Sequence, residues 1–280
     1  MKPASRADKL TLIRRATYDL TGLPPTTAEV RQFMDDQSPQ AWPRLIDRLL
    51  ESPHYGERWG QHWLDVVRYA DTAGFSNDYE LSNFWRYRDY VIDAFNADQS
   101  FADFIGEQIA GDLLPADSLQ ERHRNLVATT FLTMGNNNLE DQDKGKLRMD
   151  VVDEQLETIG RGFLAQTIGC ARCHDHKFDP IPTRDYYALA GILRSTKTLN
   201  HENVSKWIEL PLPLEPGREA ELNKREKEIR TLQAQINKLK GNTKTGKGLP
   251  PLPLNEVPGI VVDDEQAELT GSWLRSRSVS

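Results

Sequence analysis

Apolar residues recur at helical spacing, segment after segment, over residues 8–200, and this pattern constrains the fold more than any other feature of the chain. In the segment 56–71, Trp59 and Trp63 begin a broad apolar stripe along one helix face. Gly- and Pro-containing breaks separate such segments, and no alternating run long enough for a strand interrupts them. The sequence therefore predicts an all-α domain over residues 1–205.

The boundaries of the helices follow from capping residues and from Gly and Pro. Gly169 suits the position just past the end of a helix, and a polar loop is expected over residues 135–145. The segments that we expect to be helical are 7–20, 26–34, 38–52, 56–71, 84–95, 101–112, 117–133, 149–168 and 184–195.

The chain changes character after the helical domain. A Pro-rich linker is expected over 206–218, and the segment 219–241 then has a heptad-like pattern in which apolar residues fall seven apart. We expect a helix here, either solvated or part of an intermolecular coiled coil. A Gly- and Pro-rich linker follows over 242–258, and the β-branched tail, 259–280, resembles the first strands of a β-sandwich that the chain is too short to complete.

Composition excludes several classes of protein. The chain has 35 Lys and Arg against 42 Asp and Glu, a net charge of −7, which argues against nucleic acid as a partner. No apolar run approaches the ~20 residues needed to span a bilayer, so no membrane span is expected. The first ten residues contain no secretory signal. Because the tail stops early, we expect the chain to be an excerpt of a longer protein, so the missing signal says nothing about export.

Both cysteines of the chain lie in one motif, Cys170-Ala171-Arg172-Cys173-His174. The C-x-x-C-H spacing is typical of covalent haem c attachment. Two thiols at this spacing add to the two vinyl groups of one porphyrin, and the adjacent His174 becomes the proximal iron ligand. The motif therefore predicts haem thioethers at Cys170 and Cys173, and export, because haem c is attached outside the cytoplasm.

Other interpretations of the cysteines stay open. A zinc site would use Cys170, Cys173 and His176 with a further ligand, since C-x-x-C is a common half-site. A local disulfide or two free thiols would follow if haem is never attached.

The residues around the motif have candidate supporting roles. His174 is expected to donate its other ring N–H to a carbonyl or a carboxylate, and Asp175 and Asp179 are the candidate partners. His176 is assigned to a haem propionate or to hydrogen bonding behind the ligand. Candidates for a sixth iron ligand are, in order, His62, Met149 and Met134.

Six sequence runs resemble the planctomycete cytochrome-c-associated domain family of unknown function, over about residues 8–200. They are DLTGLPP at 19–25, PHYGERW at 53–59, HWLDVVRYAD at 62–71, WRYRDYV at 85–91, QIAGDLLP at 108–115 and GCARCHDHKFDPI at 169–181. The resemblance implies an exported multidomain protein in which a small cytochrome c domain precedes this one and a carbohydrate-binding-like β-sandwich follows it.

Three functions are weighed from these observations. The first is an exported, periplasmic or cell-surface haem c domain that transfers electrons to a neighbouring cytochrome c domain or another redox protein. The alternatives are a haem-dependent redox enzyme acting on a polysaccharide-related substrate, bound through the downstream sandwich, and a non-catalytic scaffold with zinc or a disulfide at the cysteines. Whether the chain is an enzyme is left open, although no hydrolase motif occurs in it.

Overall fold

The structure, a computed structural model, describes residues 5–74, 78 and 80–243. The chain divides between Leu214 and Glu215 into two compact units. The predicted start of a β-sandwich, 259–280, and nearly all of the linker 242–258 lie outside the described residues.

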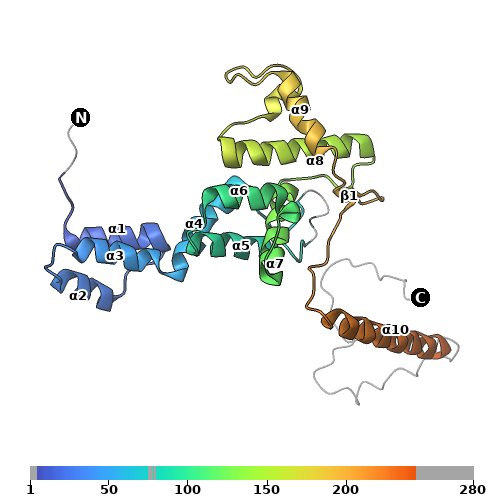
Figure 1. Cartoon of the computed structure of the whole chain (residues 1–280), viewed down its shortest axis with the longest axis horizontal. Helices are drawn as coiled ribbons and strands as arrows, with labels where there is room; N and C mark the ends of the chain where they lie inside the picture. The colour runs from blue at the N-terminus through green and yellow to red at the C-terminus, as the bar shows by residue number, and fades with distance from the viewer. Residues whose placement is uncertain (1–4, 75–77, 79, 244–280) are drawn as a thin grey trace, which may run out of the picture. The chain divides into compact units, whose positions relative to one another are not determined.

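The first unit is mostly helical in its described part, which confirms the all-α prediction (Figure 1). Its α-helices are α1 (Lys9–Thr21), α2 (Thr27–Asp35), α3 (Ala41–Leu50), α4 (Pro53–Val66), α5 (Trp85–Asn96), α6 (Phe101–Ala110), α7 (Leu119–Ala128), α8 (Lys144–Ile159) and α9 (Thr183–Leu193). Short turns and strands complete it: η1 (Gly111–Leu113), η2 (Thr129–Thr133), η3 (Gly160–Leu164), η4 (Gly169–Arg172), β1 (Leu199–Asn200) and β2 (Lys206–Trp207).

Helices α1, α2 and α3 pack around a small core of their own, which includes Ile13, Phe33 and Leu45. Local signals define these helices: Thr26 and Glu29 form a capping box at the start of α2. Gly22 ends α1 with φ of 71°, in the left-handed region that glycine adopts without a steric cost. Helix α1 also packs against α4, which joins this cluster to the next.

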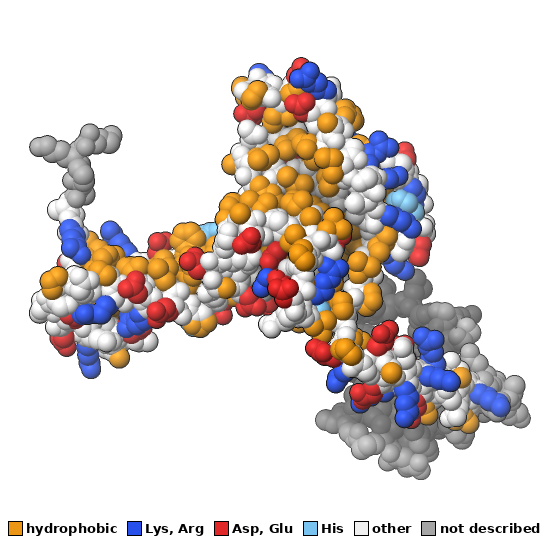
Figure 2. Space-filling view, viewed as in Figure 1, with side chains coloured by type: hydrophobic (Ala, Val, Ile, Leu, Met, Phe, Trp, Pro, Cys, Tyr) orange, Lys and Arg blue, Asp and Glu red, His pale blue; other side chains and the backbone are white. Residues whose placement is uncertain are grey.

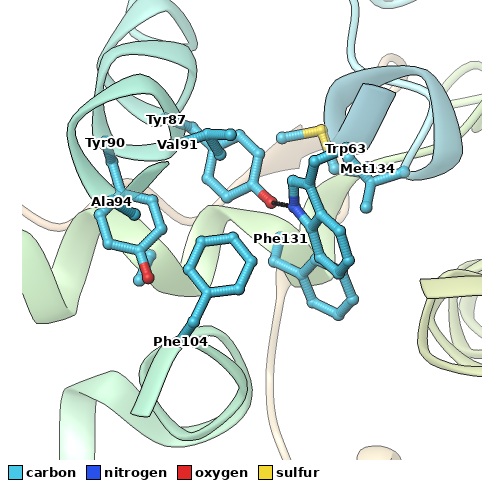
Figure 3. Packing of buried hydrophobic residues seen from close by; sticks show 10 residues of the cluster. Trp63, Tyr87, Tyr90, Val91, Ala94, Phe104, Phe131 and Met134 are labelled. Atoms are coloured by element: carbon cyan, nitrogen blue, oxygen red, sulfur yellow. Dashed lines mark hydrogen bonds between the residues drawn. The ribbon is translucent and has the colours of Figure 1, made fainter. Parts of the chain in front are cut away.

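An aromatic core fills the space between α4, α5, α6 and η2 (Figure 3). Trp63 lies at its centre and packs against Phe104 and Phe131, with ring centroids 5.1 and 6.1 Å away. The indole N–H donates to the hydroxyl of Tyr87 over 3.0 Å. Helices α4 and α5 approach so closely that a Cβ at Gly56 would stand 2.4 Å from the backbone oxygen of Ile92. Aromatic side chains of the protein therefore fill this core.

Helix α8 differs most from the prediction. It begins at Lys144 rather than at residue 149, because Asp143 caps it by accepting from the Lys146 N–H. It runs on from Ile159 into the single π-helical turn η3. Gly169 was predicted to stand just past the end of this helix, but it is the first residue of η4. A Cβ at this position would lie 2.5 Å from a carboxylate oxygen of Glu157. Close approach of Glu157, not the end of a helix, thus requires this glycine.

The hairpin of β1 and β2 extends the first unit past the predicted domain end at residue 205. Leu199 packs with Leu139, Leu147 and Val151 in a fourth apolar cluster. Further along, the carbonyl of Pro213 lies 2.6 Å from Nε2 of His123 on α7. The beginning of the Pro-rich segment is therefore attached to the helical unit.

The second unit contains α10 (Arg218–Thr243), which includes the heptad segment 219–241. Hydrophobic and charged side chains are interspersed on its visible face (Figure 2). Ile229 and Leu232 are more than half exposed, and Glu221 pairs with Arg225 one turn later. Among the described residues, no helix is long and apolar enough to span a membrane.

Candidate functional site

The two cysteines lie on one short turn at the protein surface. Cys170 is inside the 3₁₀ turn η4 and Cys173 ends it, and both are exposed free thiols. In a 3₁₀ turn, side chains three residues apart eclipse one another. The spacing of the two cysteines therefore favours sulfur atoms on the same side of the turn.

The two residues between the cysteines anchor the turn to the protein. Ala171 is fully buried and packs with Val152 and Leu156 of α8. Arg172 contacts α8 too, with Nη1 and Nη2 each 3.1 Å from Oδ1 of Asp150. Ala171 and Arg172 thus attach the turn to α8, while Cys170 and Cys173 stay exposed.

Arg172 belongs to a larger polar network. Its Nη1 is 3.3 Å from Asp153, whose other oxygen accepts the hydroxyl of Tyr186 at 2.6 Å. Partial burial opposes the guanidinium charge, but the hydrogen bond to Asp150 and the charge of Asp153 outweigh it and raise the pKa of Arg172. The carbonyl of Arg172 accepts the hydroxyl of Tyr187, so α9 also restrains the turn.

A hydrogen bond between Gly169 and Glu157 attaches the turn to α8 at a third point. The backbone N–H of Gly169 donates to Glu157, whose carboxylate also accepts from Nε of Arg161 at 2.9 Å. This network was not predicted from the sequence. A signal existed, because Asp150, Asp153 and Glu157 recur at spacings of three and four along one face of a single helix.

His174 is exposed, and its Nδ1 lies 2.8 Å from the carbonyl oxygen of Asp175. A carbonyl can only accept, so Nδ1 carries the proton and Nε2 keeps a free lone pair in the neutral ring. This is the tautomer that metal-binding histidines adopt when a carbonyl orients them. Of the two expected partners, Asp175 is the one in contact, through its backbone carbonyl and not its carboxylate.

Asp175 and His176 shape the loop that follows. The carboxylate of Asp175 accepts the backbone N–H of Thr183, the first residue of α9, at 2.8 Å. The side chain of His176 is only 6% exposed, and its Nδ1 accepts the N–H of Asp179 at 2.9 Å. His176 also donates its backbone N–H to Ile181. In this structure, both residues therefore stabilise the loop 175–183.

The candidates for a sixth iron ligand are dispersed. His62 is exposed on α4, edge-on to Trp59, whereas Met134 is 2% exposed inside the aromatic core. Met149 is half-buried on α8, the helix that packs against η4, four residues before Asp153. Of the three, Met149 shares an element with the network around the cysteines.

No group of three or more His, Cys, Asp or Glu side chains in the described part of the chain is arranged to hold a metal ion. Of the zinc ligands expected at Cys170, Cys173 and His176, the imidazole of His176 accepts two backbone N–H groups at its Nδ1. The C-x-x-C-H motif places two exposed thiols and one histidine within five consecutive residues.

Removing the charge of Arg172 is expected to destabilise the protein. In an Arg172→Met variant, Asp150 and Asp153 lose their shared cation, and the free energy of unfolding falls by about 1–3 kcal/mol at neutral pH. Urea titration measures the loss. Arg184→Met is the matched control, since Arg184 is 86% exposed beside Asp185 and its removal costs less than about 0.5 kcal/mol. Equal losses in both variants would contradict the anchoring role of Arg172.

The fold and the turn together define a helical domain with a surface C-x-x-C-H turn tied to two helices. Residues 1–198 match the PSCyt2 family, a protein of unknown function (DUF1549). The chain belongs to this family of planctomycete cytochrome-c-associated domains. No curated protein and no solved structure matches the chain.

Proposed function

We propose that the chain is an exported electron-transfer domain that carries a c-type haem covalently bound at Cys170 and Cys173, with His174 as the proximal ligand. The observation that carries the proposal is the turn itself: two exposed free thiols three residues apart, next to a histidine whose Nδ1 proton is held by a carbonyl. The cytochrome-associated family to which the chain belongs supports it.

The protein's residues have distinct parts in this proposal. Each thiol S–H adds across one vinyl C=C bond, so that sulfur bonds one carbon, hydrogen goes to the other, and no oxidant is consumed. Haem supplies one-electron redox chemistry when bound. The network of Arg172 with Asp150 and Asp153 holds the turn in place, and the carbonyl of Asp175 keeps the lone pair of His174 Nε2 available.

The remaining parts of the proposal concern the surroundings of the domain. His62 and Met149 are the proposed alternatives for a sixth ligand, and His176 has access to a propionate only if its loop opens. A neighbouring cytochrome c domain or another redox protein is the proposed electron partner. A downstream carbohydrate-binding-like β-sandwich would bring polysaccharide close to the domain.

The decisive experiment is an intact mass under denaturing conditions, on protein exported from a host with haem-maturation machinery. We expect the mass to rise by one haem and a Soret band to appear, and a Cys170→Ala/Cys173→Ala variant to lose both. Met149→Leu is the matched control: its mass keeps the haem, and its reduced spectrum changes only if Met149 binds the iron.

Other outcomes separate the alternatives. A six-coordinate low-spin spectrum supports electron transfer, whereas a five-coordinate one favours a haem-dependent redox enzyme. An unmodified mass without a Soret band overturns the haem proposal, and zinc content and a disulfide at Cys170 and Cys173 would then be measured on the same sample.

A further inference from the structure

Helix α10 differs from the other helices because its apolar side chains are exposed. Helices α1–α9, of 9 to 16 residues, each contribute at least one side chain to the four buried apolar clusters of the described chain. None of these four clusters contains a residue of α10, although α10 is 26 residues long. Its Ile229, Leu232 and Ile236 side chains are 59%, 51% and 44% exposed. Because most of the stability of a helix comes from packing of its apolar face, this face calls for a partner.

The apolar residues of α10 follow a seven-residue repeat, which defines the kind of partner. Leu222, Ile229 and Ile236 occupy position a of the repeat, and Leu232 and Leu239 occupy position d. A seven-residue repeat keeps this seam facing a partner only when the partner helix supercoils with the same repeat. Helices α1–α9 are shorter and already packed in their own clusters. The α10 of a second copy of the chain carries the matching repeat.

The residue types along the seam indicate how many helices pair and in which direction. Ile229 and Ile236 are β-branched residues at position a, whereas Leu232 is at position d. In parallel coiled coils, β-branched residues at a combined with leucine at d favour two strands over three or four. The seam of α10 is therefore suited to a parallel pair.

Arg225 is the polar residue of this seam, at its first d position. Its Nη2 lies 2.6 Å from Oε1 of Glu221 on the preceding turn, and Glu226 follows it at the edge of the seam. In a parallel, in-register pair, the two Arg225 side chains share one layer among the carboxylates of both helices. In an antiparallel pair, each would lie opposite the apolar side chain of Ile236 instead, at a cost in stability. A polar residue in a seam fixes the register and lowers the affinity, so Arg225 favours parallel pairing.

We propose that α10 pairs with the α10 of a second copy of the chain, as a parallel, in-register, two-stranded coiled coil. Ile229, Leu232 and Ile236 form the seam that the pairing buries, and Arg225 sets the register at a cost in affinity. The chain is then a dimer through its second unit. This proposal is independent of the haem proposal, because no residue of the cysteine turn takes part in the pairing.

Sedimentation equilibrium of the whole chain, over about 1–100 μM, tests the pairing. We expect a monomer–dimer equilibrium in the wild type. Leu232→Lys places a charge in the seam of both helices and should raise the dissociation constant about 100-fold or more. Arg225→Leu removes the charge from the seam and should lower the dissociation constant about tenfold.

Thr231→Lys is the matched control for Leu232→Lys. It introduces the same side chain one residue earlier, at position c, which lies outside the seam. The hydroxyl of Thr231 donates to the carbonyl of Lys227 within the same helix, so its loss removes no contact between helices. The dissociation constant of this variant should stay within a factor of about two of the wild-type value.

Disulfide trapping tests the direction of the pairing. In a Cys170→Ala/Cys173→Ala background, Arg225→Cys should give a covalent dimer when diamide is added, because diamide takes up the two thiol hydrogens as the S–S bond forms. Thr231→Cys in the same background is the control and should stay uncrosslinked. Absence of the covalent dimer in the Arg225→Cys protein would overturn the parallel, in-register arrangement.

Three results of the sedimentation measurement overturn the proposal. They are a wild type that stays monomeric up to about 100 μM, as it would with a solvated α10 or one covered by another partner, a wild-type trimer, and a Leu232→Lys variant that associates as tightly as the wild type. The wild-type measurement decides whether the chain pairs, even if a variant fails to fold.

Discussion

A Trp63→Ala variant is expected to lose about 3–5 kcal/mol of unfolding free energy, as large aromatic residues do when they are truncated in a core. Trp63 contacts aromatic rings from three elements, including Phe163 of η3 at 5.6 Å between centroids. The truncation leaves a cavity and also removes the N–H donor to Tyr87. Urea denaturation at neutral pH measures the loss.

The control for this variant is Trp63→Phe, which keeps an aromatic ring and removes only the N–H group and part of the volume. Its loss should be clearly smaller than that of the alanine variant. Because Phe163 is in the turn that follows α8, Trp63→Ala should also increase hydrogen exchange in η3. Equal stabilities of the alanine and phenylalanine variants would show that packing around Trp63 does not determine the stability of this core.

Helices were predictable because their signals are local. The capping box of Thr26 and Glu29 and the glycine after α1 can be read within a few residues of sequence. The start of α8 was misplaced because Asp143 stands in a polar segment that resembles a loop, although it caps the helix. The end of α8 was misplaced because Gly169 is required by the close approach of Glu157 and not by a helix end, and no local pattern indicates that contact.

The candidate site also has one part that the local sequence indicates and another that only the fold brings together. Spacing alone indicates Cys170, Cys173 and His174, since the chemistry of the motif is encoded in consecutive residues. The anchors of the turn come from α8 and α9, and only the fold brings Asp150 and Tyr187 to Arg172. The pair of Arg68 and Glu154 is likewise separated by more than eighty residues. Long-range ion pairs of this kind cannot be inferred from one sequence by periodicity.

The free energy of unfolding is expected to fall steeply at alkaline pH, because two buried tyrosines of the aromatic core keep their protons in the folded state. Burial raises the pKa of Tyr87 above its ordinary value of 10.0, although the hydrogen bond from Trp63 opposes this. For Tyr90, burial and then the charge of Glu107, which accepts its hydroxyl at 2.9 Å, raise the pKa in the same direction.

The sign of the effect follows from where the protons go. Above about pH 10, the unfolded chain releases the protons of Tyr87 and Tyr90 while the folded state retains them, so the stability present below that pH is lost as pH rises. Each tyrosine lowers the free energy of unfolding by about 1.4 kcal/mol per pH unit. Urea midpoints at about pH 9, about pH 10 and about pH 11 measure the slope. Tyr90→Phe should reduce this slope, and Tyr18→Phe, at an exposed tyrosine, is the matched control. A free energy of unfolding that stays constant above about pH 10 would contradict proton retention by these buried hydroxyls.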